Sequence, residues 1–299
     1  MKIFIAGDST FQYNNSSTYP QTGIGQKLPL FFTNLSQPDL AAHDIDEYTG
    51  AHAALGEAQN AIANSLTEKA QAVNENTTQA KPQNSDIQET VTFLNFARNG
   101  RSTKSFINEG RLAFIDSEIS KGDFLFIVFG HNDEKIQDPT RYTEPDGEYK
   151  KNLRIFAQTA QKHGAFPVFF TPVARRAFDN TGKRAIDTHK QYSDSMKDFA
   201  KEEGFPVIDL SELSRKLISK LGMADSARLY MNLKPGIYAN FPEGRNDNTH
   251  LTPDGAFTFA SLCAQGIIDV CGSWHGKNAE AYNKLASCIR PPKNLVSEV

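Results

Sequence analysis

The sequence contains few cysteines, and they do not form the pattern of a metal site or a disulfide framework. Cys263, Cys271 and Cys288 all lie in the last quarter of the 299 residues. Their number is odd and no two of them have C-x-x-C spacing, which argues against structural zinc and against a set of paired disulfides. We therefore expect buried free thiols.

Long apolar runs and an excess of positive charge are also missing. No stretch approaches the roughly 18–20 apolar residues that a membrane-spanning helix needs. Met1 leads directly into a short apolar segment, without the longer apolar core and cleavage site of a secretory signal. The formal net charge is −3, which does not favour a nucleic acid or an anionic membrane as a partner. These absences predict a cytoplasmic protein that binds neither nucleic acid nor membrane.

Short apolar segments alternate with helical patterns along most of the chain. Five segments have the length and composition of buried strands: 2–6, 91–96, 124–129, 166–171 and 206–210. Helices are expected between and after them, at 25–34, 112–120, 150–163, 189–203, 211–221, 253–270 and 279–289. This alternation predicts an α/β fold, a flavodoxin-like three-layer α/β/α sandwich with a five-stranded parallel sheet.

The segment 37–86 does not fit that alternation. It is rich in Ala, Gln, Asn and Glu, and its middle carries Leu55, Ala58 and Ile62 at helical spacing between polar stretches. We interpret the chain as a single domain, 1–299, with a helical and polar insertion at 37–86. Because an apolar helical stripe must be covered, this insertion is also a candidate surface for homo-oligomer formation.

Small polar residues follow three of the predicted strands and recur once before the long helix at 253–270. The four stretches are Gly7-Asp8-Ser9, Asn99-Gly100, Gly130-His131-Asn132-Asp133 and Asp247-Asn248-Thr249-His250. In a doubly wound sheet the carboxyl ends of the strands lie at one edge, where ligands bind, so the first three should meet there. No Walker A motif and no G-x-G-x-x-G segment follows a strand, which disfavours those nucleotide-binding folds.

Residues in these stretches have the types that nucleophilic catalysis requires. A serine nucleophile such as Ser9 needs a base, and the base needs a carboxylate that fixes its tautomer. His250 and Asp247 lie three residues apart, in a predicted turn, so the carboxylate can reach back to the imidazole. The backbone N–H groups of Ser9 and Gly100 and the side-chain amide of Asn132 are possible donors to an oxyanion.

In these stretches the sequence resembles the SGNH/GDSL hydrolase superfamily, whose four blocks carry Ser, Gly, Asn and His. It is more similar still to the rhamnogalacturonan acetylesterase-like branch, in segments 5–10, 99–103, 129–133, 171–176 and 247–252. The resemblance implies a serine esterase that removes O-acetyl groups from plant cell-wall oligosaccharides, such as rhamnogalacturonan fragments, through an acyl-enzyme. It implies no metal and no other cofactor. The roles it implies are nucleophile for Ser9, base for His250, orienting acid for Asp247, and oxyanion hole for Ser9, Gly100 and Asn132.

Three further residues are candidates for substrate binding. His131 lies next to Asn132, and Arg175 and Arg176 follow the fourth predicted strand, where they could meet an acidic sugar. Packing is the alternative for the histidine, and pairing with local carboxylates is the alternative for the two arginines.

Two other functions stay open at this point. One is a GDSL lipase- or thioesterase-like hydrolase of longer acyl esters, although the sequence has no extended apolar lid. The other is a non-catalytic binding module on a flavodoxin-like fold, in which Ser9 and His250 would have no joint role. A serine-directed organophosphate would label an esterase and leave such a binding module unmodified.

Overall fold

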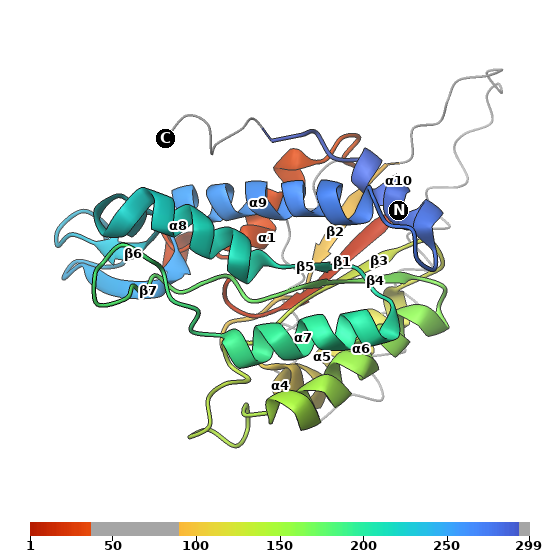
Figure 1. The fold of residues 1–299 in the computed structure, drawn as a ribbon. Helices are drawn as coiled ribbons and strands as arrows, with labels where there is room; N and C mark the ends of the chain where they lie inside the picture. The colour runs from red at the N-terminus through yellow and green to blue at the C-terminus, as the bar shows by residue number, and fades with distance from the viewer. Residues whose placement is uncertain (37–89, 293–299) are drawn as a thin grey trace. The chain divides into compact units, whose positions relative to one another are not determined.

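The computed structural model describes residues 1–36 and 90–292 (Figure 1). By compactness the chain divides into a unit of residues 1–43 and 90–299 and a second unit of residues 44–89. The predicted insertion at 37–86 lies outside the described residues. Its helix, the single-domain interpretation and the homo-oligomer therefore stay predictions.

Five strands form one parallel sheet in the order β2-β1-β3-β4-β5. They are β1 Lys2–Gly7, β2 Thr92–Asn95, β3 Phe124–Val128, β4 Phe166–Phe170 and β5 Val207–Ile208. The central strand β3 is buried at every position, as its unbroken apolar sequence requires. This strand order is the flavodoxin-like one, and it confirms the predicted α/β fold.

Helices cover both faces of the sheet (Figure 1). On one face lie α1 Ile24–Lys27, α8 Leu210–Ser226, α9 Pro253–Cys271 and α10 Ala279–Ser287. On the other lie α4 Thr103–Asn108, α5 Arg111–Glu118, α6 Lys150–Lys162 and α7 Lys190–Glu203. Short helical turns are η1 Ser16–Thr18, η2 Leu28–Phe31, η3 Pro145–Tyr149 and η4 Ala227–Leu229. The apolar faces of these helices pack against the two faces of the sheet, and the carboxyl ends of its strands stay at the surface.

Local capping explains where several helices begin and end. The hydroxyl of Thr252 accepts a hydrogen bond from the Gly255 N–H at 3.2 Å and Pro253 takes the first helical position, so α9 begins as predicted. The helix predicted at 211–221 is interrupted at Gly222, as expected, because this glycine has a positive φ of 74°, outside the helical region. A further helical stretch follows the kink, so that α8 as a whole extends to Ser226.

A second, two-stranded antiparallel sheet was not predicted. It pairs β6 Tyr230–Leu233 with β7 Arg245–Leu251. Tyr230 pairs with Leu251 and Asn232 with Asn246, so residues 247–250 bulge out of the ladder between these two pairs. The predicted turn at Asp247-His250 is therefore corrected to a bulge within a strand, which we call the catalytic bulge, residues 247–250.

The part of the chain that the structure describes contains neither a membrane-spanning helix nor a cluster of metal ligands. In that part of the chain no helix combines the length and apolar character needed to cross a bilayer. Within the same residues no group of three or more His, Cys, Asp or Glu side chains is arranged to hold a metal ion. Cys263 and Cys271 are buried free thiols, whereas Cys288 is partly exposed. The cytoplasmic location and the absence of nucleic-acid and membrane partners stay predictions.

Candidate active site

Ser9 lies in a tight turn at the carboxyl end of β1. The Asp8 carboxylate accepts hydrogen bonds from the Thr10 backbone N–H at 2.9 Å and from its hydroxyl at 2.7 Å, which holds the turn. A Cβ at Gly7 would lie 3.1 Å from the Val128 carbonyl oxygen, so glycine lets this end of β1 approach β3 closely. Ser9 is 7% exposed, and within the described residues its hydroxyl makes no hydrogen bond. The hydroxyl is therefore free to react.

Asp247 and His250 form a hydrogen-bonded pair inside the catalytic bulge. Asp247 Oδ2 lies 2.7 Å from His250 Nδ1, and Asp247 Oδ1 accepts the backbone N–H groups of Thr249 and His250 at 2.8 and 3.0 Å. One carboxylate thus shapes the bulge with one oxygen and orients the imidazole with the other. Arg245 was not predicted as a site residue, yet its guanidinium lies 2.6 Å from Asp247 Oδ2, two positions along the same strand.

The charge state of Asp247 decides which nitrogen of His250 carries the proton. Burial acts to raise the pKa of the Asp247 carboxyl, but hydrogen bonds from the His250 side chain and backbone outweigh burial and hold this pKa well below its usual range. An ionised carboxylate only accepts hydrogen bonds, so Nδ1 of His250 must be the donor. Nε2 is then the nitrogen left to accept a proton from a nucleophile.

Asn132 and Gly100 lie in two loops that are joined by hydrogen bonds. The Asn132 side-chain NH₂ donates one hydrogen bond to the Arg101 carbonyl at 3.0 Å, which leaves its second N–H available. Beneath them, the buried Asp133 carboxylate accepts hydrogen bonds from the Thr103 N–H at 3.0 Å and from the Thr143 hydroxyl at 2.9 Å. Burial raises the pKa of Asp133 to about 7. These contacts fix the loop after β3 against the loop that leads into α4.

One cleft of about 760 Å³ contains all five residues that the sequence predicted for catalysis. Ser9, Gly100, Asn132, Asp247 and His250 line it, together with polar side chains from η1, β7 and the loops between. No hydrogen bond joins the Ser9 hydroxyl to His250 in the described part of the chain, and such contacts often tighten only when substrate binds. The arrangement has the parts of an acyl-transfer site: a hydroxyl, an oriented base and several N–H donors.

The three predicted substrate-binding residues have different positions. His131 is 3% exposed and lies in the cleft wall, with Nδ1 3.1 Å from Asp8 Oδ2. Arg175 also lines the cleft, and its Nε donates to the Thr249 hydroxyl at 3.2 Å. The Arg176 guanidinium instead donates to the side-chain oxygen of Asn248 at 3.1 Å and to the Ser226 hydroxyl at 3.2 Å. The structure therefore brings the first two residues to the cleft and uses the third to hold the catalytic bulge.

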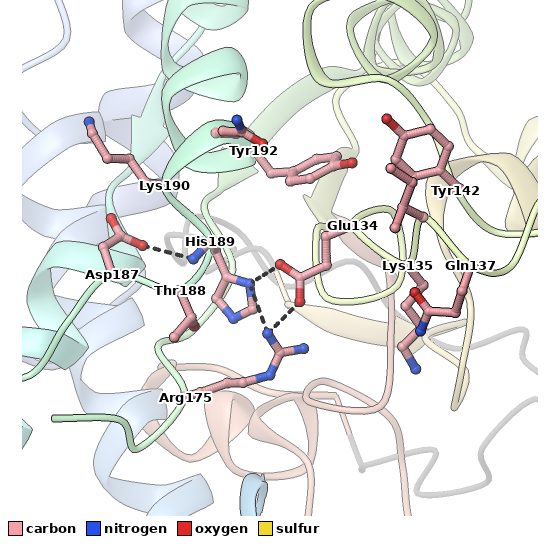
Figure 2. A pocket seen from close by; sticks show the side chains of 12 residues that line it. Glu134, Lys135, Gln137, Tyr142, Arg175, Asp187, Thr188, His189, Lys190 and Tyr192 are labelled. Atoms are coloured by element: carbon pink, nitrogen blue, oxygen red, sulfur yellow. Dashed lines mark hydrogen bonds and ion pairs between the residues drawn. The ribbon is translucent and has the colours of Figure 1, made fainter.

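A second hollow, of about 700 Å³, adjoins the cleft (Figure 2). Figure 2 shows Glu134 between His189 and Arg175, with His189 Nδ1 2.8 Å from Glu134 Oε2 and an ion pair from Glu134 to Arg175. Burial, followed by the nearby His131, lowers the pKa of His189 to about 4. Lys135 and Arg175 line both this hollow and the cleft. Sequence reasoning named Arg175 but missed Glu134, Lys135 and His189, and the signal for the first two was their position just after Asn132.

Replacing Arg176 by alanine should slow catalysis without removing any reacting group. The substitution deletes the side-chain hydrogen bonds with Asn248 and Ser226. The bulge that contains Asp247 and His250 is then held less firmly. Because small displacements of reacting groups strongly slow the chemical step, we expect kcat to fall roughly 10- to 100-fold with little change in KM. Steady-state kinetics on an acetyl ester measures both constants.

An exposed arginine provides the control for this substitution. Arg228 pairs with Asp254 at the surface, at 3.0 Å, and Arg228→Ala should keep the wild-type kcat. If Arg176→Ala raised KM and left kcat unchanged, Arg176 would be a substrate-binding residue and not a support of the catalytic bulge.

The chain is similar in sequence to a family of known proteins. A family model described as the GDSL-like Lipase/Acylhydrolase family matches residues 63–256, a range that begins after Ser9 and includes Gly100, Asn132, Asp247 and His250. The chain is 44% identical over 182 residues to rhamnogalacturonan acetylesterase RhgT of Bacillus subtilis (strain 168), covering 61% of this chain and 76% of that protein. It is 38% identical over 186 residues to the probable rhamnogalacturonan acetylesterase YesY of the same organism, covering 62% and 81%.

Solved structures are similar in fold. Protein YxiM from Bacillus subtilis superposes with a TM-score of 0.61 at 22% identity, covering 89% of this chain. This chain spans 55% of the length of that protein. A variant of Axe2, an acetyl-xylooligosaccharide esterase from Geobacillus, superposes with a TM-score of 0.51 at 12% identity, covering 89% of this chain and 93% of Axe2. At these identities the likeness shows a shared fold.

Proposed function

Because the chain belongs to the GDSL-like lipase/acylhydrolase family and is a carboxylic ester hydrolase, we propose that it removes O-acetyl groups from carbohydrates. Membership confirms the family resemblance found in the sequence. The observation that carries the proposal is the single cleft in which Ser9 lies with the Asp247–His250 pair and the N–H groups of two loops. The similarity to two proteins named as rhamnogalacturonan acetylesterases supports the choice of substrate.

The first half of the proposed reaction forms an acyl-enzyme on Ser9. Its hydroxyl oxygen attacks the acetyl carbonyl carbon while Nε2 of His250 takes the hydroxyl proton. The carbonyl oxygen becomes negatively charged and accepts hydrogen bonds from the backbone N–H groups of Ser9 and Gly100 and from the free N–H of Asn132. Collapse of this intermediate breaks the bond to the sugar oxygen, which receives the proton from His250.

The second half releases acetate. A water molecule replaces the sugar and gives its proton to Nε2 of His250 while its oxygen attacks the acetyl-Ser9 ester. The second tetrahedral intermediate then expels the Ser9 oxygen, which takes the proton back from the imidazole. Throughout both halves Asp247 stays ionised and stabilises the imidazolium that forms at His250.

The wall of the cleft favours a small acyl group on a sugar over a long acyl chain. Besides the proposed catalytic residues, side chains able to donate or accept hydrogen bonds line it: Ser17, Thr18, Gln21, Asn99, Lys135, Asn240 and Arg245. Phe241 adds one aromatic face. Hydroxyl-rich ligands use such groups, whereas an acyl chain of eight carbons needs a continuous apolar wall.

Acetate release from a panel of acetylated oligosaccharides tests the proposal, alongside p-nitrophenyl esters of increasing acyl length. We expect acetyl esters to be cleaved faster than octanoyl esters, and at least one acetylated carbohydrate to release acetate. Faster cleavage of octanoyl esters with no acetylated carbohydrate as substrate would favour the lipase-like alternative. No hydrolysis of any ester, together with no labelling by a serine-directed organophosphate, would favour the non-catalytic binding module.

A further inference from the structure

Lys135 lies where the catalytic cleft meets the second hollow. It follows β3 by a few residues, is partly buried, and lines both spaces. Figure 2 shows it with Gln137 and Tyr142 on the side of the hollow that faces His189 and Arg175. A group bound in the hollow and covalently linked to a sugar in the cleft would therefore pass this lysine.

Every other Lys, Arg, Asp or Glu side chain that lines the two spaces has a partner of opposite charge. Within the hollow the pairs are Glu134 with Arg175, Asp187 with Arg215 at 3.8 Å, and Lys190 with Asp194 at 2.5 Å. In the cleft Arg245 pairs with Asp247 at 2.6 Å. Among the residues that the structure describes, the Lys135 amine has no ion pair. Among the charged side chains that line the two described hollows it is the one without a close ion pair, and the carboxylates of Glu134 and Asp138 act on it only from a longer distance.

The surroundings of Lys135 also disfavour the positive charge of its amine. Burial, and then the positive charges of Arg141 and Arg175, lower the pKa of the Lys135 amine, and they outweigh the opposite effect of Glu134 and Asp138. Burial penalises a charged amine, and a bound anion would offset that penalty. One cation without an ion pair, flanked by the neutral side chains of Gln137 and Tyr142, matches one negative charge and several hydroxyl groups. A carboxylate on a sugar ring has this combination.

We propose that the second hollow is a subsite for a carboxylate-bearing sugar unit linked to the acetylated unit in the cleft, with Lys135 as the side chain that binds the carboxylate. This inference rests on the proposed function, since it concerns the same substrate beyond the reacting ester. It makes Lys135 a specificity-determining residue that selects acidic over neutral oligosaccharides. Catalysis itself does not involve its amine.

Substitution of Lys135 by methionine tests the subsite, because methionine keeps much of the apolar stem and removes the charge. The measured quantity is the ratio of kcat/KM for an acetylated oligosaccharide that contains galacturonate to kcat/KM for an acetylated neutral xylo-oligosaccharide. We expect Lys135→Met to lower this ratio roughly 10- to 100-fold, mainly through a higher KM for the acidic substrate. Lys135→Glu should lower it further.

Lys162→Met is the matched control, because it makes the same change of net charge at an exposed lysine paired with Asp116 on a different part of the surface. Its ratio should equal that of the wild type. An unchanged ratio in Lys135→Met, or a wild-type enzyme that prefers the neutral substrate, would overturn the subsite while leaving the proposed function intact. A wild-type enzyme that cleaves p-nitrophenyl acetate but neither oligosaccharide would instead overturn the carbohydrate function, and the subsite with it.

Discussion

Replacing Ser9 by alanine should lower kcat for acetate release by about a thousandfold or more, without a loss of stability. The substitution removes the oxygen that we propose attacks the ester, and loss of a triad member typically costs several orders of magnitude. The hydroxyl makes no hydrogen bond within the described residues, so its deletion removes no structural contact there. The backbone N–H of residue 9 remains, so a small residual rate from oxyanion binding is also expected.

Two measurements together make the Ser9 prediction decisive. Urea unfolding should give the same midpoint for Ser9→Ala and wild type, whereas kcat for acetate release should differ by about a thousandfold or more. Ser117→Ala provides the control, since this serine is exposed on α5 and its hydroxyl donates only to the Phe114 carbonyl. Wild-type acetate release by a folded Ser9→Ala protein would show that Ser9 is not the nucleophile.

Replacing Asp247 by asparagine should lower kcat by about a thousand- to ten-thousandfold and change KM little. Asparagine keeps an oxygen that can accept the Thr249 and His250 backbone N–H groups, so the catalytic bulge is retained. Its NH₂ group then faces His250 Nδ1 in place of the carboxylate oxygen. A donor in that position favours the tautomer with the proton on Nε2, which cannot accept the proton of Ser9.

Asp247→Ala separates orientation of the imidazole from formation of the bulge. Alanine loses both carboxylate oxygens, so this variant should lose stability in addition to rate, whereas Asp247→Asn should lose mainly rate. The depressed pKa of Asp247 stabilises the folded state above about pH 4 and this contribution is lost as the pH falls further, so unfolding should be compared at neutral pH. A kcat for Asp247→Asn within tenfold of wild type would contradict the orienting role.

Much of the fold was predictable because its determinants are local. Each of the five strands has a short apolar run bounded by polar or glycine residues, and the run at Phe124–Val128 is buried at all five positions. The helix at Pro253 has its N-cap and its proline in adjacent positions. The helix α4, at Thr103–Asn108, was missed because six residues are too few to show a helical period.

The positions of the proposed catalytic residues were predictable for a related reason. Strand ends of a parallel sheet meet at one edge, so knowing which residues follow β1, β2 and β3 was enough to expect Ser9, Gly100 and Asn132 in one place. Asp247 and His250 are close in sequence, and their pairing needs only a local reversal of the backbone. The strand that contains them was not predictable, because Arg245–Leu251 is mostly polar and becomes a strand only by pairing with β6.

The sheet, the order of its strand-end residues and the types of the proposed catalytic groups could thus be read from the amino-acid sequence, since they follow from periodicity and from chain connectivity. The roles of the remaining charged residues depend on contacts between segments that lie far apart along the chain. Arg175 and Arg176 are neighbours in sequence, yet one lines the cleft and the other binds Asn248, 72 positions away. Whether a cation supports a loop, pairs with a carboxylate or stays available to a ligand, as we propose for Lys135, depends on which side chains distant segments bring within a few ångströms of it.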